Sequence, residues 1–166
     1  IAEVVEKKGF KPEDIIVNLQ GDEPFVSPML IQQVACVLTD TDAPMATLCW
    51  PIQDKAEAEN PNTVKVVRDV KSHALYFSRS LIPFHRAHPK KPNHVYRHIG
   101  LYAYRAQFLL DLVHTPSCEL EDIEALEQLR VLYLGHKIKV EQAKVSPKQD
   151  INTLEDYQRA LGMTEG

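Results

Sequence analysis

An apolar run that ends in a glycine turn with two acids constrains the fold of this chain more than any other segment. Residues 15–19 read IIVNL, and the turn QGDEP follows at residues 20–24. The run is rich in β-branched side chains and lacks strict alternation, which is typical of a parallel strand buried on both faces. Ligands bind at the carboxyl ends of parallel strands, so we expect Gln20, Asp22 and Glu23 to lie at a site. A polar loop that only closes a core strand is an equally good interpretation of this segment alone.

Composition and charge are those of an ordinary globular protein. The chain has 166 residues, of which 44% are apolar and 25% charged, so we expect one domain with one core. The net charge of −4 argues against general binding to nucleic acids or to membrane surfaces, and no segment resembles a membrane span or a signal peptide. Three scattered cysteines without a metal-binding spacing indicate reduced thiols in a cytoplasmic protein.

The beginning of the sequence and its glycines bear on nucleotide binding. The first nine residues have the pattern of the end of an amphipathic helix without its N-cap, so we expect further sequence upstream. The six glycines are all isolated, so neither a GxGxxG nor a Walker loop is present. If the protein binds a nucleotide, we expect the phosphate loop to lie outside this sequence.

Alternating patterns predict an α/β domain with an inserted or appended β element. We expect helices over residues 28–38, 117–135 and 153–161, a short helix or turn over residues 54–60, and strands over residues 45–52, 63–68, 74–79, 96–105 and 138–143. A basic, proline-rich loop over residues 83–94 is either a solvated linker or a lid over an anionic substrate. Residues 74–105 are expected to mediate a homodimer, because pairing would bury their aromatic side chains, Tyr76, Phe77, Tyr102 and Tyr104.

Several polar residues are candidates for a site. Asp22, Asp150 and Asn152 offer the oxygen ligands that Mg²⁺ prefers, although simple capping of the tail helix is the better interpretation of the last two when taken alone. Arg79, Arg86 and His98 would suit a carboxylate or phosphate as a cationic cup, but a half-buried imidazole with satisfied hydrogen bonds is the simpler interpretation of His98. Glu127 and Gln128 either face solvent or bind sugar hydroxyls. No hydrolytic triad or zinc spacing is present.

Six stretches together resemble the 3-deoxy-manno-octulosonate cytidylyltransferases, also called CMP-Kdo synthetases. They are AEVVEK, IIVNLQGDEP, NPNTVKVVRD, ALYFSRSLIP, RHIGLYAYRA and LEQLRVLYLGHKI, and they occur in the order found in the family. The resemblance covers nearly the whole chain. It implies a Rossmann-like nucleotidyltransferase domain over residues 1–166 that lacks the N-terminal CTP-binding segment, with residues 74–105 as the dimerisation element.

The resemblance also implies an activity and a site. Enzymes of the family transfer CMP from CTP to the anomeric hydroxyl of the acid sugar Kdo, with Mg²⁺ bound, and release pyrophosphate for lipopolysaccharide biosynthesis in the cytoplasm. It implies that Asp22 binds the metal and that Arg79 and Arg86 clamp the sugar carboxylate or the phosphate. The implied sugar-binding residues are Gln20, His98, Tyr102, Glu127 and Gln128.

The sequence departs from the family at its tail. The family pattern Val-Asp-Thr-Pro-Glu-Asp is replaced by INTLED at residues 151–156, so the expected second metal carboxylate is Asn152. An amide carries no charge and should bind Mg²⁺ more weakly, unless Asp150 compensates. Three alternatives therefore stay open: a cytidylyltransferase for another acid sugar, a non-catalytic sugar-binding or dimerisation fragment, and a metal-dependent glycosyltransferase.

Overall fold

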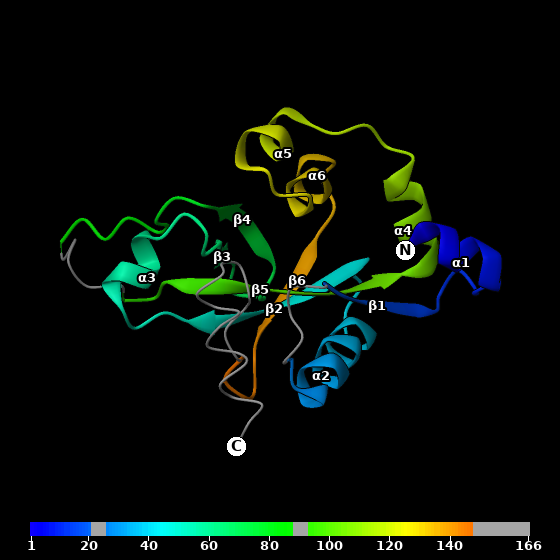
Figure 1. Ribbon diagram of the computed structural model, residues 1–166, viewed down its shortest axis with the longest axis horizontal. Helices are drawn as coiled ribbons and strands as arrows, with labels where there is room; N and C mark the ends of the chain where they lie inside the picture. Colours follow the sequence, from blue (N-terminus) through cyan, green and yellow to red (C-terminus); the bar gives the residue numbers. More distant parts are fainter. Residues whose placement is uncertain (21–25, 88–92, 148–166) are drawn as a thin grey trace, which may run out of the picture.

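A six-stranded sheet forms the centre of the computed structural model, which describes residues 1–20, 26–87 and 93–147 (Figure 1). Its strands are β1 (Ile15–Leu19), β2 (Met45–Pro51), β3 (Lys65–Arg68), β4 (Ala74–Ser78), β5 (Tyr96–Arg105) and β6 (Ile138–Gln142). The helices are α1 (Ala2–Lys8), α2 (Pro28–Thr39), α3 (Lys55–Glu59), α4 (Ala106–Val113), α5 (Glu119–Glu124) and α6 (Gln128–Tyr133). The strand order is β4-β3-β5-β2-β6, and β1 also pairs with β5. The long strand β5 therefore joins β1, β2 and β3.

The first strand differs from its prediction as a parallel strand buried on both faces. β1 pairs antiparallel with β5, with Ile15 opposite Arg105 and Leu19 opposite Leu101. Its residues are half-buried, apart from the exposed Leu19. Among the described strands, only β2 and β6 pair in parallel. An apolar composition reports that a strand has apolar neighbours, whereas its direction depends on pairing with a segment more than eighty residues away.

The two faces of the sheet carry separate hydrophobic clusters. Alternate residues of β2 and β5 pack against α2, and this first cluster includes Leu30, Val34, Leu38, Leu48 and Leu101. The opposite face packs against α4 and α6, and this second cluster includes Met45, Phe77, Tyr102, Tyr104, Leu129 and Val131. Figure 1 shows α2 on one side of the sheet and α4, α5 and α6 on the other. The sheet thus separates a purely structural layer from the layer that carries the polar candidates.

The helix predicted over residues 117–135 is two short helices. The backbone enters the left-handed region at Ala125, with φ 50°, and this residue separates α5 from α6. The N-cap of α5 is Cys118, and its side chain makes no capping hydrogen bond. The apolar spacing runs through the break, so the pattern alone does not reveal it. Gly135, with φ 81°, follows the end of α6 as predicted.

Other predicted elements are confirmed. Ser27 caps α2 by accepting a hydrogen bond from the Met29 amide at 3.3 Å, and Pro28 is the first helical residue. The strands predicted over residues 45–52, 63–68, 74–79, 96–105 and 138–143 are all present with small differences at their ends. Helix α4 was not predicted, since it follows β5 directly, without a turn residue or a side-chain cap. The tail helix predicted over residues 153–161 lies outside the described residues.

The four aromatic residues on which the predicted dimer rests, Tyr76, Phe77, Tyr102 and Tyr104, do not need a second subunit for their burial, whereas Phe84 in the same segment is 73% exposed. Phe77, Tyr102 and Tyr104 are buried within the chain, with exposed fractions of 0%, 2% and 4%, and Tyr76 is half-buried. Both strands of the segment belong to the central sheet. The argument for a dimer from aromatic burial is therefore wrong, while the dimer itself stays a prediction. Within the described ranges, every helix is too short or too polar to cross a membrane.

Candidate functional site

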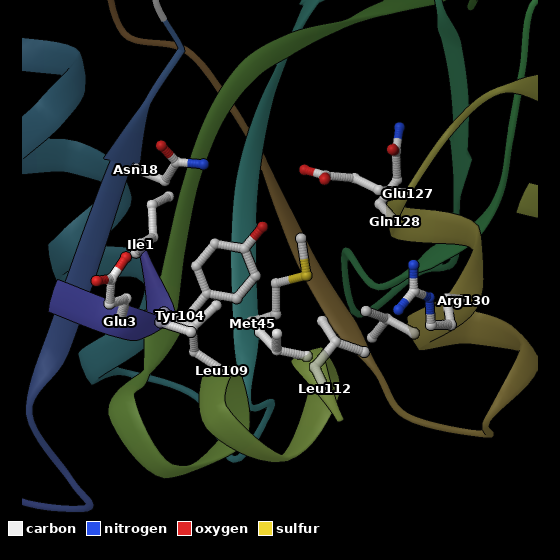
Figure 2. A pocket seen from close by; sticks show the side chains of 13 residues that line it. Ile1, Glu3, Asn18, Met45, Tyr104, Leu109, Leu112, Glu127, Gln128 and Arg130 are labelled. Carbon is white, nitrogen blue, oxygen red and sulfur yellow. The ribbon is translucent and has the colours of Figure 1, made fainter. Parts of the chain in front are cut away.

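A pocket of about 460 Å³ opens on the face of the sheet that carries α4 and α6 (Figure 2). Its polar side chains come from four elements: Glu3 from α1, Asn18 from β1, Tyr104 from β5, and Glu127, Gln128 and Arg130 from the beginning of α6. Its apolar wall includes Met45, Leu109, Leu112 and Val131. A concave site with a few polar groups over an apolar wall is typical of a small-molecule binding site.

Two of the predicted sugar-binding residues lie in this pocket. Gln128 is only 2% exposed, and its amide makes no hydrogen bond to any described residue. Figure 2 shows the Glu127 carboxylate and the Tyr104 hydroxyl projecting toward the same space. Burial raises the pKa of Glu127 and the nearby Glu121 raises it further, whereas Arg130 lowers it. Solvent still reaches the Glu127 side chain, so the carboxylate lies at the pocket mouth, where it is available to accept hydrogen bonds.

A row of rings along β5 connects the pocket to His98. The Tyr104 and Tyr102 ring centroids are 5.9 Å apart, and those of Tyr102 and His98 are 5.1 Å apart. Phe77 from β4 meets the His98 ring edge-on at 5.2 Å. Burial strongly raises the pKa of Tyr104, so its phenol stays protonated and remains a hydrogen-bond donor. The predicted sugar-binding residues His98 and Tyr102 are therefore in contact, and Tyr104 links them to Glu127 and Gln128.

His98 is a neutral residue in this structure. Its Nε2 lies 2.9 Å from Thr47 Oγ1, and burial lowers the pKa of the imidazole to about 3. It therefore carries no positive charge at neutral pH and does not add to a cationic cup with Arg79 and Arg86. The simpler interpretation of His98, a half-buried imidazole with a hydrogen-bond partner, agrees with the contact between Nε2 and Thr47.

Arg79 braces the segment that leads into the pocket. Its guanidinium donates from Nε to the Glu124 carbonyl at 2.7 Å, and from its terminal nitrogens to Pro61 O at 3.1 Å and Ala125 O at 3.3 Å. Its amide and the Ser78 hydroxyl donate to the two oxygens of the Glu124 carboxylate, at 2.9 and 2.6 Å. These bonds join the end of β4 to the α5–α6 junction, two residues before Glu127.

A second brace joins α5 to α6. Arg130 donates from Nε to Glu121 Oε2 at 2.6 Å, and a second bond from its Nη2 to Glu121 Oε1 makes the pair bidentate. The remaining terminal nitrogen donates to the Thr115 carbonyl at 2.8 Å. The hydrogen bond from Arg130 lowers the pKa of Glu121, and the same bond raises the pKa of Arg130. Arg130 thus fixes the pocket wall beside Glu127.

The other predicted site residues have no described contact with the pocket. Gln20 is half-buried and directly follows β1. Arg86 is exposed between β4 and β5 and makes no hydrogen bond or ion pair with described residues. The predicted metal ligands Asp22, Asp150 and Asn152 lie outside the described residues, and no cluster of metal-binding side chains is present within them. The magnesium site therefore stays a prediction.

Several residues of this region were not identified from the sequence. Asn18 carried a signal, because it is the single polar side chain in the apolar run 15–19. Tyr104 was assigned to a subunit interface, although it lines the pocket. Thr47 and Arg130 had no distinguishing sequence signal, since their contacts depend on segments far away in the chain.

Comparison with known sequences gives relatives that are all cytidylyltransferases. Residues 1–138 match the family model described as cytidylyltransferase. A protein from Legionella pneumophila (strain Lens) is 62% identical over 156 residues, which cover 94% of this chain and 62% of that protein. One from Serratia proteamaculans (strain 568) is 48% identical, covering 100% of this chain and 69% of that protein. Both are named 3-deoxy-manno-octulosonate cytidylyltransferase. The chain thus spans less than two thirds of the Legionella relative's length.

Solved structures give the same picture. A CMP:2-keto-3-deoxy-manno-octonic acid synthetase complexed with CTP superposes with a TM-score of 0.77 at 37% identity, covering 99% of this chain and 67% of that one. A 4-diphosphocytidyl-2C-methyl-D-erythritol synthase from Anaerococcus prevotii DSM 20548 has a TM-score of 0.56 at 15% identity and covers 99% of this chain and 64% of that one. The second likeness concerns the fold alone.

Proposed function

Because the chain belongs to the 3-deoxy-manno-octulosonate cytidylyltransferase family, we propose that its protein transfers CMP from CTP to the anomeric hydroxyl of Kdo. In this reaction the sugar oxygen bonds to the α-phosphorus, and the bond to the β-phosphate breaks, so that pyrophosphate leaves. The product would serve lipopolysaccharide biosynthesis. One observation in the structure carries the proposal: His98 and Tyr102 lie on the same face of the sheet as a pocket that contains Glu127 and Gln128, whose amide makes no hydrogen bond to the described part of the chain.

The pocket side chains suit a polyhydroxylated sugar. The Gln128 amide supplies two donors and an acceptor, and Glu127 supplies two acceptor oxygens at the pocket mouth. His98 and Tyr102 extend this set along β5. Gln20 directly follows β1, and the resemblance implies that it also binds the sugar. We assign these five residues to the sugar.

The two arginines would bind the anionic groups. Arg79 uses three of its five N–H donors on backbone carbonyls, which leaves two for a carboxylate or phosphate. Arg86 is exposed and has no described partner, so its guanidinium is available to an incoming anion. Fixed positive charge at these positions would stabilise the charge that develops on the phosphates during the attack.

We also propose a magnesium ion, a homodimer and a cytoplasmic location. Asp22, with Asp150 or Asn152, would hold the ion, which neutralises phosphate charge when bound.

A dimer is supported by exposed apolar residues near the sheet edge, Leu75 on β4 and Ile123 on α5, which are 62% and 72% exposed. The free thiols of Cys36, Cys49 and Cys118 suit a reducing compartment. A titration with Mg²⁺ would test the metal site, and sedimentation of the protein would test the homodimer.

The test is pyrophosphate release from CTP and Kdo with Mg²⁺, run on this chain and on the full open reading frame. In the longer protein, Gln128→Ala should lower kcat/KM at least about tenfold, because one charge-neutral hydrogen-bonding group of the sugar site is lost. Gln32→Ala is the matched control, since Gln32 is exposed on α2, across the sheet. Equal turnover in Gln128→Ala and wild type would contradict the assignment of the pocket.

One alternative has an observation in its favour. Asn152 stands where the family has a carboxylate, which favours a protein that binds the sugar without catalysis. If the full-length protein binds Kdo but releases no pyrophosphate, this alternative holds. Assays with other acid sugars side by side would identify a cytidylyltransferase for a different substrate.

A further inference from the structure

The Thr47 hydroxyl is surrounded by three hydrogen-bonding groups. Thr47 lies on β2, opposite Tyr102, and is fully buried. Its Oγ1 lies 2.8 Å from the Leu101 carbonyl oxygen, 3.1 Å from the Ile99 carbonyl oxygen and 2.9 Å from His98 Nε2. A β-bulge produces this arrangement, because the register between β2 and β5 shifts after Thr47 and directs two carbonyls of β5 at one side chain.

Counting protons determines which group donates. A hydroxyl has one proton, and a backbone carbonyl can only accept. The Thr47 proton therefore goes to one of the two carbonyls, and Oγ1 accepts from the remaining donor, which must be the N–H at His98 Nε2. If Nε2 lacked a proton, three acceptors would compete for the one hydrogen of the Thr47 hydroxyl, which is fully buried, at a cost typical of unpaired buried groups.

The rest of the ring environment fixes the imidazole. Phe77 meets it edge-on, with an interplanar angle of 87°, and Tyr102 lies against it at 36°. Within the described residues, no second hydrogen bond is formed by the His98 side chain. Burial disfavours the doubly protonated ring, in agreement with its lowered pKa. With the proton on Nε2, Nδ1 carries a lone pair and can only accept.

We propose that Thr47 is a positioning residue that holds His98 in the Nε2–H tautomer, so that Nδ1 accepts a hydrogen bond from a hydroxyl of the bound sugar. The identity of the ligand rests on the proposed function, but the tautomer does not. This arrangement selects among ligand groups: a hydroxyl or an ammonium can donate to Nδ1, whereas a carboxylate or phosphate oxygen would face a lone pair. His98 therefore binds a hydroxyl of the acid sugar, whereas Arg79 and Arg86 bind its carboxylate.

The test is the ¹⁵N spectrum of the His98 imidazole in the labelled full-length protein at neutral pH, without substrate. The His98 signals are identified by their absence in His98→Gln. We expect a protonated Nε2 and an unprotonated Nδ1, two nitrogens that resonate far apart. Thr47→Val removes the acceptor while keeping the side-chain shape, so the single tautomer should be lost. Thr47→Ser keeps the hydroxyl and should restore it.

A second measurement links the tautomer to binding. Saturating Kdo should shift the Nδ1 signal, and Thr47→Val should raise the KM for Kdo about tenfold, with the KM for CTP unchanged. A wild-type ring protonated at Nδ1 would overturn the proposal, and so would a Thr47→Val protein with the wild-type tautomer. If Kdo binds without shifting the Nδ1 signal, His98 does not accept a hydrogen bond from the sugar, and that part of the proposal is wrong. If the tautomer is as expected but Kdo does not bind, the proposed function fails and the role of Thr47 stands.

Discussion

Lys65 shows how one residue can tie together segments that lie apart in the sequence. Its side chain is fully buried, and its Nζ donates to the backbone carbonyls of Asn60, Thr63 and Arg79. The ammonium thus joins the turn before β3 to the end of β4. The alternation of residues 63–68 predicts the strand correctly, but it does not predict this burial, since one of the carbonyls comes from fourteen residues further on.

Replacing Lys65 by Met should therefore lower the free energy of unfolding by about 3 kcal/mol, because buried carbonyls lose a charged donor that methionine cannot supply. Lys137→Met is the control, since the Lys137 side chain is 58% exposed and should change the value by less than about 0.5 kcal/mol. Urea unfolding of both variants measures the difference. Equal stabilities would mean that the three hydrogen bonds do not contribute.

His98 predicts a specific dependence of stability on pH. Burial lowers its pKa from 6.5 to about 3, so the folded protein binds fewer protons than the unfolded chain between these values. The free energy of unfolding should therefore fall as the pH decreases through this window, by up to about 1.4 kcal/mol per pH unit, and be unaffected above it. In urea titrations at about pH 6.5 and 5, wild type should lose about 1.6 kcal/mol more than His98→Gln, because the histidine of the unfolded chain is already half protonated at the upper pH. Parallel losses in the two proteins would contradict a buried neutral imidazole.

At the level of helices and strands, local patterns predict the elements but not their breaks or partners. The strand over residues 96–105 is recognised exactly, because its aromatic and apolar residues are typical of a pleated surface. The apolar spacing of residues 120–132 likewise marks a helical face, but it does not show that the chain turns at Ala125. That turn depends on Arg79 and its bonds to the Glu124 and Ala125 carbonyls, and it places Glu127 and Gln128 in the pocket. The site residues could be named from the resemblance, whereas their supports could not.

Ala125 offers a direct test of this junction. It adopts a left-handed conformation, with φ 50°, at the end of α5, where glycine is free of the strain that a Cβ atom brings. Ala125→Gly should raise the free energy of unfolding by about 0.5–1 kcal/mol, as measured by urea unfolding. The same exchange at Ala35, in the middle of α2, should lower it by a similar amount. A destabilised Ala125→Gly protein would show that the junction does not hold this conformation in solution.

For the molecule as a whole, the sheet divides the core into two layers, one of which affects stability alone and the other both stability and the arrangement of the site. Val34 on α2 and Val131 on α6 are both fully buried, but they belong to clusters on opposite faces, and only Val131 lines the pocket. Stability depends on both layers, because each buries apolar area against the same sheet. The arrangement of the site depends on the α6 layer alone.

Matched truncations should separate these two properties. Val34→Ala and Val131→Ala each remove the same two methyl groups and should each lower the free energy of unfolding by about 2–3 kcal/mol. The losses should add to within about 0.5 kcal/mol in the double variant, since the sheet lies between the sites. In the full-length protein at a temperature where both variants stay folded, only Val131→Ala should raise the KM for Kdo, because only that cavity lets Gln128 and its neighbours shift. An equal effect of Val34→Ala on KM would mean that the sheet transmits the disturbance, and that the site depends on the whole core.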